Sequence, residues 1–137
     1  MKNLFMLLLP LIVFSGILVG FTTTQEDHDA FKNNNGENIV NKIETIQNSV
    51  EELSKTLVNN KNNFQKINRI GSEIANEWDV IDTTIEDQYP DEFTKLHRSL
   101  FPIITLATEA TPYTHKLKKL IGPAQQSLER FQKNISS

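Results

Sequence analysis

The chain lacks cysteine entirely, and this absence removes several classes of chemistry. Without a thiol among the 137 residues there can be no disulfide bond, no thiolate metal site and no cysteine nucleophile. Positive charge is not in excess either, because 14 lysine and arginine residues face 17 aspartate and glutamate residues, for a formal net charge of -3. Nucleic-acid-binding domains usually carry a strong basic footprint. We therefore expect no nucleic-acid partner.

Recognisable catalytic motifs are missing as well. The sequence holds no glycine-rich phosphate loop, no G-x-S-x-G and no H-E-x-x-H. Its serines have no histidine and carboxylate at a catalytic spacing. We expect a protein that is not an enzyme and that carries no cofactor.

One long hydrophobic run is present, at the N-terminus. The residues from Leu4 to Phe21 carry no charge, and as a helix they would span about 27 Å, close to the thickness of a bilayer core. Lys2 precedes the run and Glu26 follows it, so the positive-inside rule places the N-terminus in the cytoplasm and the rest of the chain outside. Residues 1–21 fit a signal anchor that holds the protein at the cell membrane, or a signal peptide whose removal would release a secreted protein. The lack of a good small-residue cleavage site favours the anchor.

Residues 22–37 are predicted to be a flexible linker, because they offer little apolar surface to offset the entropy of ordering. Residues 38–137 are long enough for one domain. Apolar residues recur in steps of three and four through this range, which is typical of amphipathic helices. The first such stripe, from Asn38 to Asn60, contains Ile39, Ile43, Ile46, Val50, Leu53 and Leu57. It fits packing within a bundle or a coiled-coil homodimer, and the similar stripes that follow favour the bundle.

Three more helical patterns follow the first. The second runs from Phe64 to Asp87 and contains the single tryptophan, Trp78, at a core position. Gly71 lies on the same stripe, where it is expected to admit a bulky neighbour from another helix. Pro90 should end this helix, because the residue before a proline avoids the helical region.

The third pattern contains Pro102, which predicts a kink or a short break. The fourth should begin with Thr111 as its N-cap and Pro112 at its first position, and should bend or divide at Gly122-Pro123. Together the patterns predict an all-α fold, in which an N-terminal transmembrane or signal helix precedes an antiparallel, up-down-up-down four-helix bundle.

Charge is unevenly distributed over these helices. The second carries six carboxylates from Glu73 onward, whereas the fourth is mainly basic. Carboxylates four residues apart lie on one face of a helix and can bind a hard cation if another helix adds ligands. The candidate metal ligands on this reasoning are Glu73, Glu77, Asp82, Glu86 and His97. A solvated acidic face is the more common explanation of such a pattern.

The spacing of apolar residues around Trp78 suggests a family. The run Trp78, Ile81, Ile85, Tyr89-Pro90, Phe93, Leu100 resembles helical modules of extracytoplasmic iron-uptake proteins, namely the imelysin-like family and the helical extensions of bacterial iron permeases. The resemblance covers at most Ile70 to Phe131, and it implies a helical fold and a link to metal-ion uptake. The metal-binding His-x-x-Glu motif of that family is missing, since Leu100 stands three residues after His97.

Location and pattern together predict a non-enzymatic, membrane-tethered or secreted protein of the bacterial envelope. We expect its helical bundle to act as a binding or accessory module that contacts a transporter, another envelope component or a small cationic ligand through the acidic second helix. The alternative is a structural envelope protein that self-associates through a coiled-coil-like helix.

Overall fold

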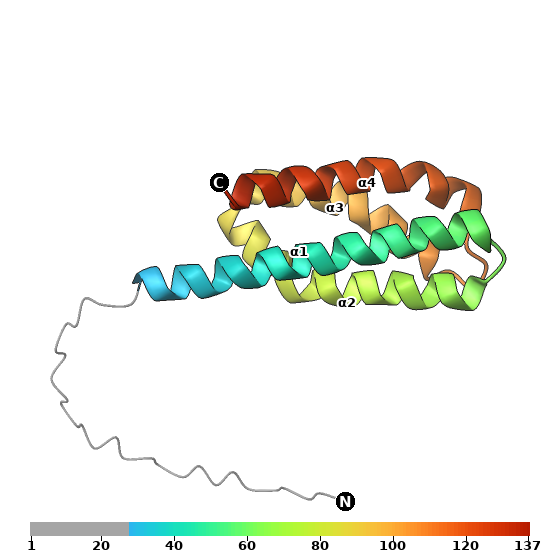
Figure 1. Cartoon of the computed structure of the whole chain (residues 1–137), viewed down its shortest axis with the longest axis horizontal. Helices are drawn as coiled ribbons and strands as arrows, with labels where there is room; N and C mark the ends of the chain where they lie inside the picture. Colours follow the sequence, from blue (N-terminus) through green and yellow to red (C-terminus); the bar gives the residue numbers. More distant parts are fainter. Residues whose placement is uncertain (1–27) are drawn as a thin grey trace, which may run out of the picture.

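The computed structural model describes the chain from His28 to Ser137, with the backbone alone for residues 28–35 and 37. Four helices make up this part: α1 (His28–Asn59), α2 (Phe64–Gln88), α3 (Pro90–Ala107) and α4 (Thr114–Ile135) (Figure 1). These residues contain no strand, so the predicted all-α class and the helical bundle are confirmed. No helix between His28 and Ser137 combines the length and hydropathy that a bilayer span requires. The predicted membrane or signal segment, residues 1–21, lies outside the described residues.

The core is built from the apolar stripes that the sequence predicts. Twenty-one buried apolar side chains from all four helices form a single cluster, which excludes water from every helix interface. Each helix packs against its neighbours in the chain, and α1 also packs against α4. Within residues 28–137, no Cα atom of α1 lies within 8 Å of α3, and none of α2 lies within 8 Å of α4, so these two pairs are diagonal. All six apolar residues of the α1 stripe are at most 2% exposed. The stripe therefore packs inside the bundle.

The α1 helix begins earlier than expected. It starts at His28, within the range predicted to be a linker and well before Asn38. Its first turns extend beyond the ends of the other helices (Figure 1). The apolar stripe begins only at Ile39, so this signal could not reveal the extension. Once a helix is nucleated, each added residue gains a backbone hydrogen bond without tertiary packing.

The three connections between helices differ in how the following helix begins. Asn63 caps α2 by accepting a hydrogen bond from the Lys66 backbone N–H at 3.0 Å. Tyr89 alone separates α2 from α3, so α2 ends just before Pro90 as predicted, and Pro90 itself takes the first position of α3. The predicted start of α4 at Thr111-Pro112 is wrong. The N-cap is Tyr113, and Pro112 is buried ahead of the helix, where its ring packs instead of starting a turn.

Prolines do not divide the helices. Pro102 lies inside α3 and Pro123 inside α4, and each helix continues through its proline. The predicted break at Phe101-Pro102 and the division at Gly122-Pro123 are therefore absent. A proline removes one backbone hydrogen bond. Buried residues flank each proline, Leu100 and Ile103 in α3 and Ile121 and Ala124 in α4, and their packing keeps both helices in the core.

Close packing of α2 against the end of α3 explains Gly71. A Cβ atom at this position would lie 2.6 Å from the Ala107 Cβ and 3.2 Å from the Ala107 carbonyl carbon. The prediction that a bulky side chain packs against Gly71 is wrong, because the glycine instead allows the backbone of α3 at Ala107 to come close. One turn earlier, the Asn68 side-chain amide donates hydrogen bonds to the carbonyl oxygens of Ala107 and of Glu109, the latter at 2.8 Å. Asn68 thus satisfies acceptors left free where α3 ends.

Candidate functional site

The predicted metal ligands on α2 are largely engaged by neighbours. Glu73 forms an ion pair with Arg69 one turn away. Glu77 pairs with Lys42 of α1 at 2.7 Å, and both side chains are less than one-third exposed. These two carboxylates therefore stabilise α2 and its contact with α1.

The other three candidates are dispersed. Asp82 accepts a hydrogen bond from the backbone N–H of Thr83 at 2.6 Å, Glu86 is exposed, and His97 belongs to α3. The described residues contain no group of three or more histidine, aspartate or glutamate side chains arranged to hold a metal ion. The structure therefore does not gather the five candidates into one site.

His97 instead belongs to a column of aromatic rings. Its imidazole stacks on Phe101, with ring centroids 5.1 Å apart, and lies 5.5 Å from Phe93. Phe93 in turn stacks on the buried Trp78 at 5.9 Å. Because the three α3 residues are four apart, they lie one above another on the same side of the helix. The column places His97 among aromatic neighbours.

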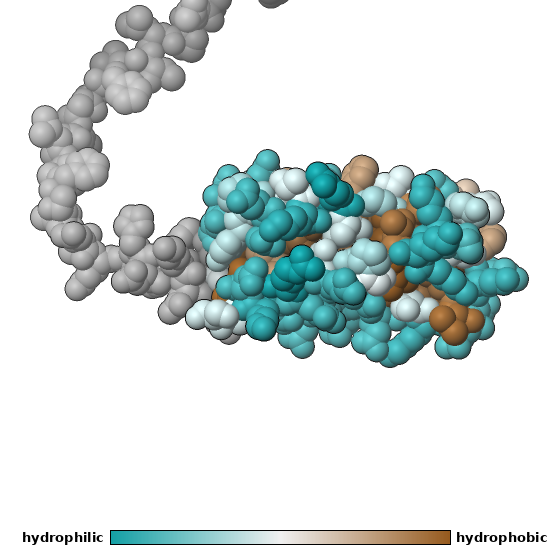
Figure 2. Space-filling view, turned by 90° about the horizontal axis from the view of Figure 1, so that it is seen from above, coloured by the Kyte–Doolittle hydropathy of each residue, from teal (hydrophilic) through white to brown (hydrophobic). Residues whose placement is uncertain are grey.

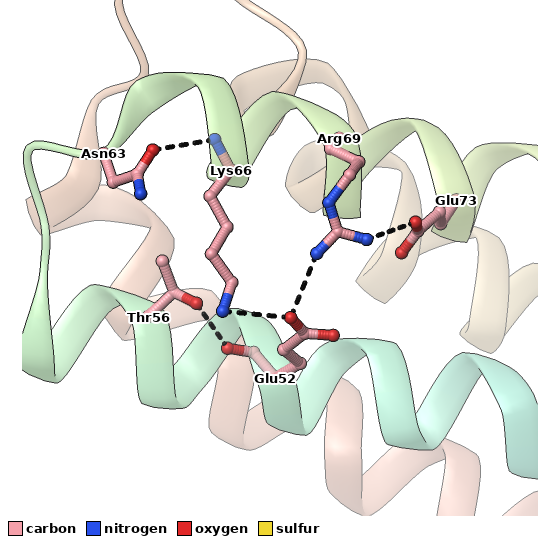
Figure 3. A network of polar contacts seen from close by, with 6 residues as sticks. All are labelled: Glu52, Thr56, Asn63, Lys66, Arg69 and Glu73. Carbon is pink, nitrogen blue, oxygen red and sulfur yellow. Dashed lines mark hydrogen bonds and ion pairs between the residues drawn. The ribbon is translucent and has the colours of Figure 1, made fainter.

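A network of ion pairs joins α1 to α2 (Figure 3). The Glu52 carboxylate accepts from Lys66 and from Arg69, each at 3.1 Å, and Arg69 also contacts Glu73. The hydrogen bond from Lys66 lowers the pKa of Glu52 below its usual value, with a further contribution from Arg69. Positive charge at this interface is therefore neutralised within the bundle, which makes it a structural contact.

The charge of α4 is not neutralised in this way. Its basic residues outnumber Glu129 five to one, and they are Lys116, Lys118, Lys119, Arg130 and Lys133. Among the described side chains, those of residue 36 and residues 38–137, no ion pair involves α4. No Cα atom of α4 lies within 8 Å of a Cα atom of acidic α2. The acidic and basic helices therefore lie diagonally across the bundle.

A groove lies between α3 and α4 on the basic side. Its volume is about 310 Å³, and its lining residues are Glu92, Lys95, Arg98 and Ser99 from α3 and Leu120, Pro123, Ser127 and Arg130 from α4. The four α4 residues follow steps of three and four, and Glu92, Lys95 and Ser99 of α3 do the same with Arg98 beside Ser99, so the lining residues of each helix share one face. Short side chains between long basic ones leave the hollow. The face that contains α4 is largely hydrophilic, with apolar atoms visible between the hydrophilic side chains (Figure 2).

The electrostatics of this groove are one-sided. Its single carboxylate, Glu92, pairs with Lys95 at 2.8 Å. Arg98 and Arg130 are exposed and form no ion pair with any other described residue. The groove therefore carries three cations against one anion, and its two guanidinium groups are available to a ligand.

Sequence reasoning identified the basic face of α4 but missed the groove. The lining residues of α4, from Leu120 to Arg130, are spaced 3, 4 and 3 apart beside the apolar stripe. This spacing is a usable signal only when α3 is known to be the neighbour, because Lys95 and Arg98 supply the other wall.

Comparison of the chain with protein-family models, with curated proteins and with solved structures finds no match. The resemblance to imelysin-like helical modules therefore stays a prediction. The α3–α4 groove brings basic, hydroxyl and apolar side chains together in one hollow.

Proposed function

We propose that this chain is a non-enzymatic binding module that takes up an anionic ligand or partner on the side formed by α3 and α4. Its helices alternate in direction as an up-down-up-down bundle. Support for this topology comes from the short connections, since a single residue joins α2 to α3, and from the packing of each helix against its chain neighbours. The hydrophobic run from Leu4 to Phe21 holds the bundle on the outer side of a cell membrane.

The observation that carries the proposal is the positive charge of the groove in a chain of net negative charge. The whole chain has a net charge of -3, yet the groove sets Lys95, Arg98 and Arg130 against Glu92 alone. A planar guanidinium binds carboxylate or phosphate oxygens through two parallel hydrogen bonds. Two unpaired arginines in one hollow therefore favour an anion.

The metal-uptake function rests on the resemblance alone. Glu73 and Glu77 are each held by a basic side chain, so a cation would have to displace Arg69 and Lys42 to reach them. For this reason we place the ligand in the groove and leave metal binding out of the proposal.

Self-association through α1 is the alternative function. Its stripe, from Ile39 to Leu57, is buried against α2 and α4. A coiled-coil dimer along this stripe would have to open the bundle core. The buried stripe therefore favours the binding module.

The sign of the charge on the binding side gives a direct test. The purified full chain in a non-ionic detergent would be titrated with poly-glutamate and with poly-lysine at low and high salt. We expect poly-glutamate to bind at low salt despite the net negative charge of the protein, and binding to weaken as salt rises. If poly-glutamate does not bind at any salt concentration, the proposed binding side is wrong.

Location needs its own experiment. Alkaline phosphatase fused to the C-terminus is expected to be active, because the bundle should lie outside the cytoplasm. N-terminal sequencing of the extracted product distinguishes an intact signal anchor from a cleaved signal peptide. An inactive fusion would overturn the proposed location.

A further inference from the structure

The α3–α4 groove has the size of a small-molecule site. Its volume of about 310 Å³ lies at the lower end of the range of about 300 to 1,000 Å³ typical of ligand pockets. An inorganic anion alone would leave most of such a volume to water. Leu120 and Pro123 give part of the wall an apolar character, which suits a ligand with a carbon body.

The charge of the lining indicates the charge of the ligand. Lys95, Arg98 and Arg130 contribute three positive charges and Glu92 one negative charge, which leaves a net charge of two positive units. A phosphate monoester carries between about -1.5 and -2 at neutral pH, so it matches this surplus. Arginine forks suit its oxygens better than an ammonium group does.

The two serines of the groove differ in what they can offer. Ser99 donates its hydroxyl hydrogen to the Leu96 carbonyl oxygen at 3.0 Å, so this hydrogen is already engaged. Ser127 makes no side-chain hydrogen bond within the described part of the chain, residue 36 and residues 38–137, so its hydroxyl can donate to a ligand oxygen. The groove thus combines two free guanidinium groups, one free hydroxyl and an apolar wall.

We propose that the groove binds one small organic phosphate, a phosphate monoester with a short apolar body, whose charged group is held by Arg98 and Arg130 and whose body packs on Leu120 and Pro123. The inference rests on the proposed function, to which it adds the class of ligand. Binding is stoichiometric, with one ligand for each chain.

Calorimetry of the full chain in a non-ionic detergent tests the ligand class. The probes are phenyl phosphate, inorganic phosphate and benzyl alcohol, which separate the organic phosphate from its charged part and from its apolar part. We expect one phenyl phosphate to bind for each chain, at least tenfold more tightly than inorganic phosphate, and no heat with benzyl alcohol. Equal affinity for phenyl phosphate and inorganic phosphate would overturn the role of the apolar wall.

Matched variants test the site. Arg98→Gln and Arg130→Gln each remove one charge from the groove, and Lys116→Gln and Lys133→Gln remove the same charge from exposed positions of α4 outside it. Loss of a hydrogen bond to a charged group weakens binding about tenfold or more, so the groove variants should raise the Kd by that factor and the control variants less than twofold. All four side chains are exposed, so the bundle should fold in each variant, which circular dichroism checks.

Two results separate this inference from the proposed function. Binding of poly-glutamate without binding of phenyl phosphate would overturn the small-ligand site and leave the proposed binding side standing. Equal weakening by groove and control variants would show diffuse attraction and overturn the site in the same way. Failure of both poly-glutamate and phenyl phosphate to bind would overturn the proposed function together with the inference.

Discussion

Replacement of Gly71 by alanine should destabilise the bundle, even though alanine is the better helix former. The new Cβ atom would lie 2.6 Å from the Ala107 Cβ, 3.2 Å from the Ala107 carbonyl carbon and 3.3 Å from the Thr108 Cγ2. The nearest atom is bonded directly to the α3 backbone and cannot rotate away. To relieve the contact, α2 and the end of α3 must move apart.

Two opposing terms set the size of the effect. Alanine in place of glycine stabilises a helix by about 0.5 to 1 kcal/mol, whereas overpacking a well-packed core costs about 1 to 3 kcal/mol. The steric term is the larger, so we expect Gly71→Ala to lower the free energy of unfolding by about 1 kcal/mol.

Gly122 provides the matched control. It lies in the interior of α4, it is exposed, and a Cβ atom there would meet nothing within 4 Å apart from its chain neighbours and the backbone of its own helix. Helix propensity favours alanine at this position, and contact with the ring of Pro123 removes part of the gain. We therefore expect Gly122→Ala to stabilise the protein by between about 0 and 1 kcal/mol.

Urea denaturation followed by circular dichroism would measure both variants in the same detergent. The expected result is a lower midpoint for Gly71→Ala and an unchanged or higher midpoint for Gly122→Ala, with equal slopes. The double variant Gly71→Ala/Ala107→Gly removes the shortest contact, so its two changes should be non-additive. A midpoint for Gly71→Ala that rises as much as that of Gly122→Ala would refute the close approach of α2 and α3.

Three further predictions concern other contacts of the bundle. Trp78→Ala should lower the free energy of unfolding by about 3 to 5 kcal/mol, because only 4% of the side chain is exposed; a loss below about 1 kcal/mol in urea denaturation would contradict its burial. Asn68→Ala should lower the free energy of unfolding by about 1 to 2 kcal/mol, since it removes both hydrogen bonds to the end of α3. Amide hydrogen exchange near Ala107 should become faster, and unchanged exchange there would argue against the contact. Because the pKa of Glu52 is lowered in the folded state, its contribution is present above the unfolded pKa and is lost as pH falls through the folded pKa. The free energy of unfolding should thus fall between pH 6 and pH 3 by slightly more in the wild type than in Glu52→Gln. The difference should stay below about 1 kcal/mol because the pair with Lys66 is solvated, and identical pH profiles of the two proteins would exclude this contribution.

The sequence predicts the core of this fold well, because burial follows apolar spacing. Ile74, Trp78, Ile81 and Ile85 recur in steps of three and four, and all four are buried. The junction at Pro90 is equally readable, since a proline constrains the residue before it. Local chemistry therefore determines where helices face inward and where α2 ends.

Features that depend on neighbouring helices could not be predicted in the same way. The contact of Gly71 with Ala107 joins residues that lie far apart in the chain, and no local pattern identifies the partner. The groove has the same character, since Arg98 and Arg130 become one site only when α3 and α4 lie side by side. The carboxylate pairs on α2 look like a cation site in sequence because Lys42 lies on another helix and is invisible there.

The diagonal placement of acidic α2 and basic α4 gives the bundle one negatively charged and one positively charged side. A protein with a net charge of -3 would be expected to avoid negatively charged surfaces. Here the charge is not uniformly distributed, since basic α4 and acidic α2 are diagonal to each other in the bundle. Near an anionic surface the bundle should therefore turn α4 toward that surface and α2 away from it. The same charge distribution should orient the bundle so that an approaching anion meets the groove first.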